Sequence, residues 1–376
     1  MNNEIALRTG KGEYMQGETV YGAVYLNICT PTEANGIQVS FKGIETCIYE
    51  YEYDGRKTLK NETIHINFSN VDLYSQTEFF QFGCYVFPFK FDLPKTIPGT
   101  FKYKGAANGS AWDVDVSYLL QAHAVKVDGI QASQKLIVYQ AKESECKDSH
   151  VGSANDVSFK PSLFSLTGNR IHITIKLLEN FVETGSNMQL RLIVTNQSKV
   201  HVSGFTIKLL RYLKLYMRGM EMSDHVVPKK SDSKVLQNME FSENKLHIAP
   251  EFGPHQVYSM TGSFDALMVG NCSSGLDRLQ IPLQENLDDI PPTVEGKHVK
   301  NQYGVEVIVR FNNGHTETVN LKIPGVLPRK NLEWGRWTPP DWTFRAETKL
   351  STSLFSVSEL LLRTEAFSGL PAFQVL

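Results

Sequence analysis

The chain contains the same turn-and-strand pattern twice, at a spacing of 168 residues. Gly17 and Gly36 in the first half are matched at that offset by Gly185 and Gly204 in the second half. In both halves an aromatic residue and a glycine turn lead into a segment of alternating apolar and polar residues. This alternation is the period of a β-strand with one buried face. The repeat predicts one β-rich domain built twice.

Later landmarks repeat with looser spacing. The pair Ile97-Pro98 returns as Ile290-Pro291, and the strand at Tyr118 returns at Tyr303. Loops of different length between conserved strands are expected after a duplication, because doubling a loop costs only about 0.6 kcal/mol. Alternating segments dominate the chain, and residues 312–315 are predicted to form a hairpin loop. Many short antiparallel strands at regular spacing indicate β-sandwiches.

The length of 376 residues fits two domains of ordinary size and a tail. A polar, charged stretch over residues 142–158 is predicted to link the domains, and a shift in composition follows Pro328. We therefore divide the chain into an N-terminal sandwich (1–157), a C-terminal sandwich (158–328) and a tail (329–376). The alternation predicts inward-facing side chains at Val20, Val24, Phe89, Phe91, Leu93 and Tyr118 in the first sandwich, and at Met188, Leu190, Leu192, Ile207, Tyr303 and Val305 in the second.

Charge and motifs argue against several functions. The formal net charge is −2, so no bulk attraction to nucleic acid is expected. The five cysteines are scattered without a CxxC pair, which predicts neither a zinc site nor a disulfide framework. The sequence lacks the short motifs of hydrolases, P-loop proteins and zinc peptidases. We expect no enzyme activity, no metal and no cofactor.

The sequence also bears on location. The first residues show no basic stretch followed by an apolar one, and no run of 18 apolar residues occurs. We expect a cytoplasmic protein with only peripheral membrane association, in which the five glycosylation sequons are chance matches.

The segment from Gly83 to Pro94 contains a Phe-Pro-Phe-x-Phe-x-Leu-Pro run. Ile97-Pro98 and the Tyr118–Ala122 strand follow it, and a Gly-Glu-x-Val-x-Gly-x-Val pattern begins at Gly17. In this order, and with the repeat, the motifs resemble arrestins over almost the whole chain to about residue 328. The nearest resemblance is to the alpha-arrestins, or arrestin-domain-containing proteins.

The resemblance implies an all-β fold of two tandem immunoglobulin-like arrestin β-sandwich domains with a C-terminal tail. It also implies a non-catalytic adaptor that binds cytoplasmic tails of membrane-protein cargo and couples them to a ubiquitin ligase or to clathrin-type coat proteins. Such an adaptor would be recruited from the cytoplasm to the plasma membrane or endosomes. The alternative is a structural coat subunit of retromer type, and an extracellular sugar-binding sandwich is a more distant one.

The first strand offers two candidate cargo- and phosphate-binding residues, Arg8 and Lys11. Visual and beta-arrestins begin with an extra strand whose adjacent lysines hold receptor phosphates, whereas here residues 5–7 already align with the second strand. The other interpretation of Arg8 and Lys11 is that they are solvent-facing strand residues.

The tail contains Pro339-Pro340-Asp341-Trp342 where alpha-arrestins carry Pro-Pro-x-Tyr. In those proteins the motif docks as a polyproline helix on the WW domains of ubiquitin ligases. The competing prediction is that Trp334, Trp337 and Trp342 pack back onto the C-terminal domain, because buried aromatic rings contribute large apolar areas.

A second tail element, Leu354-Phe355-Ser356-Val357-Ser358, approximates a clathrin-binding box in which Ser358 occupies the acidic position. Phosphorylation of Ser358 would supply the missing charge. The alternative is a capping box from Ser356 to Glu359 that opens a helix ended by Gly369. If the tail serves only recruitment, deleting residues 345–376 is expected to leave thermal stability nearly intact.

Overall fold

The computed structural model describes most of the N-terminal half, much of the tail and parts of the region between them. The described residues are 2–52, 55–107, 110–140, 154–159, 171–177, 181–184, 187–196, 202–216, 232–242, 256–261, 279–282, 291–311, 313–323, 325–328, 330–350 and 355–373.

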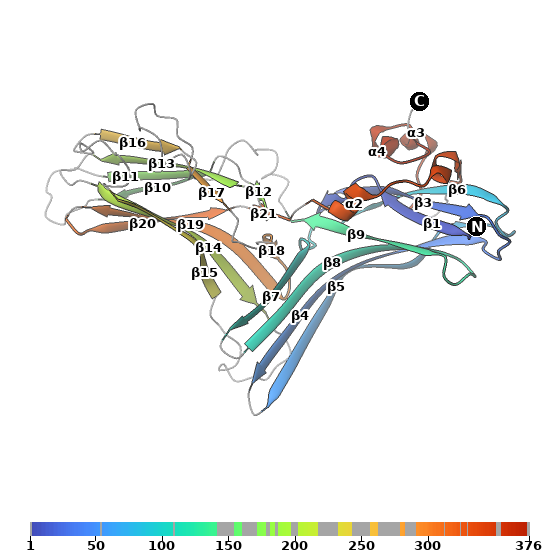
Figure 1. Ribbon diagram of the computed structural model, residues 1–376, viewed down its shortest axis with the longest axis horizontal. Coiled ribbons are helices and arrows are strands. Elements are labelled where there is room, and N and C mark those ends of the chain that lie inside the picture. Colours follow the sequence, from blue (N-terminus) through green and yellow to red (C-terminus); the bar gives the residue numbers. More distant parts are fainter. Residues whose placement is uncertain are drawn as a thin grey trace. The chain divides into compact units, whose positions relative to one another are not determined.

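The chain divides into two compact units (Figure 1). Unit 1 contains Met1–Gln140, the short segment Glu295–His298 and Lys330–Leu376. Unit 2 contains Ala141–Val294 and Val299–Arg329. The tail therefore belongs with the N-terminal part of the chain.

Two sheets build unit 1. The four-stranded sheet has the order β1 (Glu4–Thr9), β3 (Thr19–Ile28), β6 (Gly83–Asp92) and β22 (Glu347–Thr348). The six-stranded sheet has the order β2 (Glu13–Met15), β9 (Gln131–Tyr139), β8 (Ser110–Ala124), β4 (Gly36–Glu52) and β5 (Arg56–Ser75), with β7 (Phe101–Ala107) paired to β8. Neighbouring strands are mostly antiparallel, and the exceptions are β2 beside β9 and β22 beside β6.

Aromatic side chains fill the core of unit 1. The ring of Phe41 lies 4.7 Å from that of Phe91 and 6.2 Å from that of Tyr118. The predicted inward-facing residues of this unit are confirmed, since all are buried: Val20, Val24, Phe89, Phe91, Leu93 and Tyr118. The alternation succeeded because each of these strands has one face on the core.

Glycine is required where β1, β3 and β6 come together. A Cβ built on Gly22 would lie 2.3 Å from the ring of Phe89 and 2.8 Å from the backbone oxygen of Arg8. Gly17 has a φ of +79°, in the left-handed region that favours glycine. This left-handed backbone conformation explains why a glycine occupies position 17 in the turn.

Unit 2 contains three groups of paired strands among the described residues. One sheet has β10 (Ala154–Phe159), β11 (Ile171–Leu177), β13 (Asn187–Asn196) and β16 (Gln256–Thr261), with β17 (Leu279–Pro282) on β13. Another has β15 (Asp232–Ser242), β14 (Val202–Leu215), β19 (Val299–Phe311) and β18 (Val294–Glu295), with β20 (Thr316–Ile323) on β19. The third is the parallel pair β12 (Phe181–Glu183) and β21 (Gly325–Leu327).

The predicted core of unit 2 is confirmed for Met188, Ile207, Tyr303 and Val305, which are all buried. The side chains of Leu190 and Leu192 lie outside the described part. The predicted hairpin loop between β19 and β20 is also present, with Gly314 at a φ of +81°.

A tyrosine–proline hydrogen bond occurs in both units. The hydroxyl of Tyr118 donates to the carbonyl of Pro98 at 2.6 Å, and Tyr303 donates in the same way to the carbonyl of Pro291. These are the two proline and tyrosine landmarks that repeat in the sequence. The duplication therefore preserves a buried polar contact as well as the strand pattern.

The tail forms short elements that pack on unit 1: α2 (Leu332–Arg336), η2 (Asp341–Arg345), β22, α3 (Glu359–Leu362) and α4 (Glu365–Ser368). The expectation that the tryptophans pack on the C-terminal domain is wrong, because their contacts are with β1 of unit 1. The capping box is also wrong. The first helix starts after Ser358, and a break at Arg363–Thr364 separates it from α4, which ends at Gly369 as predicted.

Candidate partner-binding surface

Arg8 on β1 lies beneath two tryptophans of the tail. Its guanidinium carbon is 3.8 Å from the ring centre of Trp334 and 4.7 Å from that of Trp337. An N–H of the same guanidinium donates to the backbone oxygen of Trp334 at 2.6 Å. Burial lowers the pKa of Arg8 to about 10, so the side chain stays charged at neutral pH. The tail thus covers a cation with aromatic faces, which attract positive charge.

Helix α2 is held on β1, β2 and β9 by hydrogen bonds from Asn331 and Trp334. Asn331 caps the helix by accepting from the amide of Trp334 at 3.0 Å, and its side chain donates to the backbone oxygen of Lys135 at 3.1 Å. The amide of Asn331 donates to the carboxylate of Glu13. The indole of Trp334 donates to the backbone oxygen of Thr9 at 3.1 Å. Polar contacts from three strands therefore fix the tryptophans over Arg8.

Lys11 lies just beyond β1 in a different environment. Its ammonium pairs with Glu18, and its side chain remains 51% exposed. An exposed ion pair of this kind contributes little stability, about 0–1 kcal/mol. Of the two predicted anion-binding residues, Lys11 is accessible and Arg8 is covered.

The proline–tryptophan motif is docked along β1. The indole of Trp342 donates to the carboxylate of Glu4 at 2.9 Å. The backbone oxygen of Pro340 accepts from the amide and the hydroxyl of Thr343 at 2.9 Å and 2.6 Å. Pro339 and Pro340 are half-buried. The motif therefore lies in a turn, and the Trp342 indole and the Pro340 carbonyl are already hydrogen-bonded.

The clathrin-like element is partly buried in the core of unit 1. Phe355 lies 5.4 Å from the ring of Phe68 and 5.6 Å from that of Phe91, and its backbone oxygen accepts from the amide of Lys90 at 3.1 Å. Val357 is buried as well. Leu354 lies outside the described residues. Ser358 is exposed at the start of α3, and its side chain makes no capping hydrogen bond.

The end of the tail completes a second apolar cluster on the outer face of β3 and β6. Its buried members are Ala23, Tyr25, Val86, Val357, Phe367, Leu370 and Phe373. The hydroxyl of Tyr25 donates to the backbone oxygen of Pro371 at 2.8 Å. Sequence reasoning missed these anchors. The sequence features that could have identified them are the three-residue spacing of Phe367, Leu370 and Phe373 and the apolar residues on the outward face of β3.

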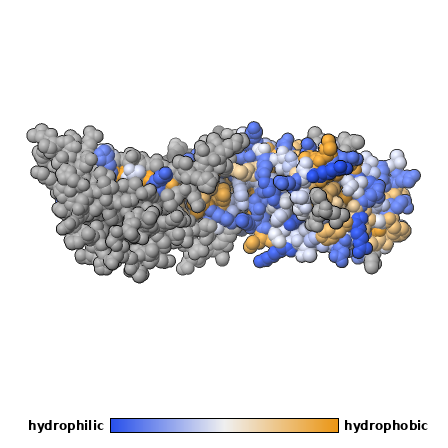
Figure 2. All heavy atoms as spheres, turned by 90° about the horizontal axis from the view of Figure 1, so that it is seen from above, coloured by the Kyte–Doolittle hydropathy of each residue, from blue (hydrophilic) through white to orange (hydrophobic). Residues whose placement is uncertain are grey.

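The surface of unit 1 seen in Figure 2 is mainly hydrophilic, with hydrophobic patches between the polar residues. Large hydrophobic side chains that remain exposed include Phe79, Phe82, Phe344 and Leu360. Two of these four residues, Phe344 and Leu360, belong to the tail.

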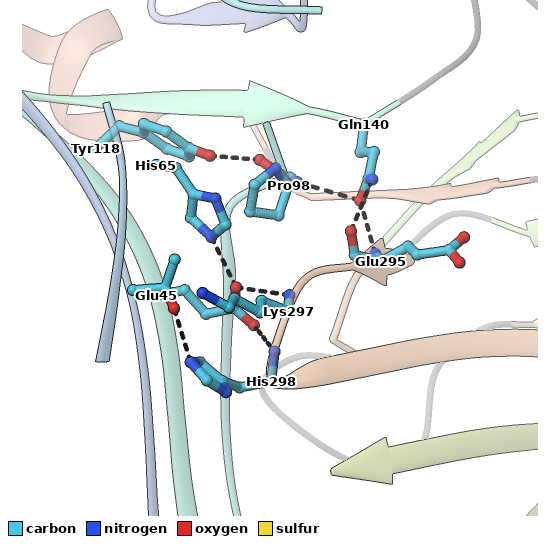
Figure 3. Close-up of polar contacts among 10 residues, drawn as sticks. Glu45, His65, Pro98, Tyr118, Gln140, Glu295, Lys297 and His298 are labelled. Atoms are coloured by element: carbon cyan, nitrogen blue, oxygen red, sulfur yellow. Dashed lines mark hydrogen bonds and ion pairs between the residues drawn. The ribbon is translucent and has the colours of Figure 1, made fainter. Parts of the chain in front are cut away.

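A buried carboxylate forms a second polar site in unit 1, at β4 (Figure 3). The Glu45 side chain is fully buried and accepts from the amides of Lys297 and His298 at 2.8 Å and 2.6 Å. Its Oε2 also lies 2.7 Å from Nε2 of His65 on β5. A Cβ on Gly296 would lie 2.4 Å from Oε1 of Glu45, so a larger residue there would displace the carboxylate from its hydrogen bonds.

Gln140 holds the same short segment at its other end. Its side-chain oxygen accepts from the amide of Glu295 at 2.7 Å, and its amide group donates to the backbone oxygen of Glu295 at 3.0 Å. The side chains of Glu45 and Gln140 therefore bind the backbone of residues 295–298, and Nε2 of His298 lies 2.8 Å from the hydroxyl of Thr63. Sequence reasoning did not identify this site.

Replacing Glu45 by Gln is expected to lower the free energy of unfolding at neutral pH by about 1–3 kcal/mol, because an amide cannot accept from all three donors. Burial raises the pKa of Glu45, but hydrogen bonds from His65 and from the two backbone amides outweigh it and hold the pKa below its usual value. The stabilisation is therefore present at neutral pH and is lost as the pH falls through this lowered pKa.

Urea denaturation of wild type and Glu45→Gln across the acidic range checks this prediction. The matched control is Glu50→Gln on the same strand, whose exposed pair with Arg56 is worth little. An acid limb of the stability curve that is identical in wild type and Glu45→Gln would contradict the assignment.

Two sequence profiles match the chain. That of the arrestin (or S-antigen) N-terminal domain matches residues 4–138, and that of the arrestin (or S-antigen) C-terminal domain matches residues 167–328. The chain therefore belongs to the arrestin family, as its motifs and its duplicated β-rich units predicted. Arrestins are in general non-catalytic adaptors.

Three Dictyostelium discoideum proteins are similar to the chain. Arrestin domain-containing protein B is 23% identical over 65% of this chain, protein A is 26% identical over 52%, and protein C is 28% identical over 46%. The matched regions cover 39%, 35% and 25% of those proteins, so the chain spans well under half of their length.

None of the helices formed by the described residues has the length and apolar character needed to cross a membrane. No group of three or more His, Cys, Asp or Glu side chains in the same part of the chain is arranged to hold a metal ion.

Proposed function

We propose that this arrestin-family protein is a non-catalytic trafficking and signalling adaptor whose cargo-binding surface lies at β1 of unit 1. Cytoplasmic tails of membrane-protein cargo bind beside β1, and Arg8 and Lys11 contact their acidic or phosphorylated residues. The adaptor works from the cytoplasm and is recruited to the plasma membrane or endosomes.

The observation that carries this proposal is the position of Arg8. Arg8 is not a solvent-facing strand residue, because two tryptophan rings and a backbone carbonyl cover its guanidinium. A hydrogen bond from the guanidinium to a carboxylate or phosphate is stronger than its bond to the Trp334 carbonyl, because both partners are then charged and the contact can be bidentate. An anionic cargo residue therefore competes with the tail for the same guanidinium.

Two motifs of the tail are the candidate contacts to downstream partners, and displacement of the tail would affect both. Pro339, Pro340 and Trp342 are the candidate ligase contact, and Leu354, Phe355, Val357 and Ser358 are the candidate coat contact. Trp342 is bonded to Glu4, and Phe355 and Val357 are buried. Neither motif is fully accessible while the tail is docked. Displacement of the tail by cargo would expose both motifs, and two weak contacts to a clustered partner reinforce each other.

The test is a titration of phosphorylated and unphosphorylated cargo-tail peptides against the full chain, followed by fluorescence anisotropy. The phosphorylated peptide is expected to bind wild type more tightly. Arg8→Ala/Lys11→Ala should remove most of that preference, roughly tenfold or more in Kd, since a hydrogen bond to a charged group is worth about 1.5–3 kcal/mol.

Trp334→Ala, which removes one covering ring, should tighten binding of the phosphorylated peptide. Lys104→Ala on β7 is the matched control, because Lys104 is an exposed lysine paired with Asp113 away from β1. Equal affinities for both peptides in every variant would exclude the charge role.

A further inference from the structure

Two cysteines lie at the same end of the paired strands β3 and β6. Cys29 directly follows Ile28, the last residue of β3, and Cys84 is the second residue of β6. In the register of this pair Asn27 is opposite Cys84. Both thiols are free and only partly buried.

The two side chains share one face of the sheet. The thiol of Cys84 lies 3.4 Å from Oδ1 of Asn27, which places it on the face that Asn27 occupies. Residues two apart along a strand point to the same side, and continuing this alternation one residue past β3 puts Cys29 on the same face as Asn27, near enough to Cys84 to influence its charge. Cys84 and Cys29 are therefore diagonal neighbours across the strand pair.

The separation is close to what a disulfide needs. Diagonal neighbours in a sheet have Cα atoms about 7–8 Å apart, and disulfides span about 4.4–6.8 Å. A movement of about 1 Å brings the two within range. Cys29 is beyond the paired residues of β3, and its amide is held by the side chain of Asn3 at 2.9 Å, so the chain can adjust there without breaking the sheet.

We propose that Cys29 and Cys84 form a redox pair, which a small-molecule disulfide such as glutathione disulfide converts into an intramolecular disulfide. The proposal does not depend on the adaptor function. The site lies at the same end of β6 as the tail, since β22 pairs with Tyr85 and Val86.

The chemistry is a pair of thiol–disulfide exchanges. The thiolate of one cysteine attacks a sulfur of glutathione disulfide and expels one glutathione thiolate, which leaves a mixed disulfide on the protein. The second cysteine thiolate attacks the protein sulfur of this mixed disulfide and expels the second glutathione thiolate. The two cysteines lose two electrons and two protons, and glutathione disulfide becomes two molecules of glutathione.

The reaction should be faster at higher pH. Burial and the neighbouring Cys29 raise the pKa of Cys84, and the cation of Arg345 only partly opposes them. The thiolate fraction therefore increases as the pH rises above neutral. Cys47 offers an internal comparison, because it is fully buried and burial raises its pKa to about 12.

The experiment treats the folded full-length chain with glutathione disulfide at pH 8 and maps the products by mass spectrometry without reduction. In wild type Cys29 and Cys84 are expected to lose their thiols, to retain no glutathione and to appear as one cross-linked peptide pair. Cys29→Ser and Cys84→Ser should each retain one glutathione on the remaining cysteine of the pair, since no second thiol expels it. Cys47→Ser should behave like wild type.

Three results would overturn the proposal. They are stable glutathione adducts on Cys29 or Cys84 in wild type without a cross-link, no reaction at either cysteine, and a cross-link from either one to another cysteine of the chain. Circular dichroism before treatment checks that each variant is folded.

Discussion

Deleting residues 345–376 is expected to lower the free energy of unfolding of unit 1 by roughly 5 kcal/mol or more, because several fully buried side chains are removed and each contributes about 1.5–3 kcal/mol. Phe355, Phe367, Leu370 and Phe373 leave the structure, and the outward face of β3 around Tyr25 becomes exposed. Thermal and urea unfolding of the deletion variant measure the effect. This expectation reverses the one drawn from the sequence.

Point substitutions show how much of the loss of stability comes from lost side-chain packing and how much from the shortened chain. Phe367→Ala should cost about 3–5 kcal/mol if the tail is firmly packed, since Phe367 is 0% exposed. Leu360→Ala on α3 is the matched control, because Leu360 is 80% exposed and should change stability very little. A deletion variant as stable as the full chain would show that the tail does not hold unit 1 together.

Phe89→Ala is expected to cost roughly 3–5 kcal/mol in unfolding free energy, the usual range for a fully buried phenylalanine. Phe89 is 0% exposed, and its ring packs 6.2 Å from that of Phe91. Phe82→Ala, just before β6, removes the same side chain from a position that is 65% exposed and serves as the control. Equal denaturation midpoints for Phe89→Ala and wild type would contradict the core.

The fold was largely predictable because local rules agree with the tertiary structure. Alternation identified the inward residues of β3, β6 and β8, because each strand has one face on the core. Of the repeated glycines, Gly17 marks a turn, and the repeated tyrosines and prolines mark a buried hydrogen bond that both units keep.

The docking of the tail was not predictable from local pattern. The contact between Arg8 and Trp334 joins residues 326 positions apart. A cluster of tryptophans indicates that some apolar surface will cover them, but it does not say which sheet provides that surface. The same holds for Phe355 and Val357, whose spacing suits an exposed ligand motif and a buried strand equally well.

The Glu45 site left one trace in the sequence. Glu45, Cys47 and Tyr49 are every second residue of β4, and Cys47 and Tyr49 are buried. Glu45 therefore belongs to the inward-facing set of this strand. A charged residue in that set needs partners. The partners that satisfy it are backbone amides more than 250 residues away, at Lys297 and His298. Backbone amides occur at almost every residue, so no sequence motif could have predicted which of them bind Glu45.

The most direct test of the account is hydrogen exchange over residues 331–345 of the full chain, the part of the tail that contacts β1, with and without a saturating phosphorylated cargo-tail peptide. The account predicts amides protected by packing in the free protein and faster exchange when the peptide is bound, because cargo and tail compete for β1. Amides that exchange as fast as an unfolded chain in the free protein would contradict the docked tail. Protection unchanged at saturating peptide would contradict the competition.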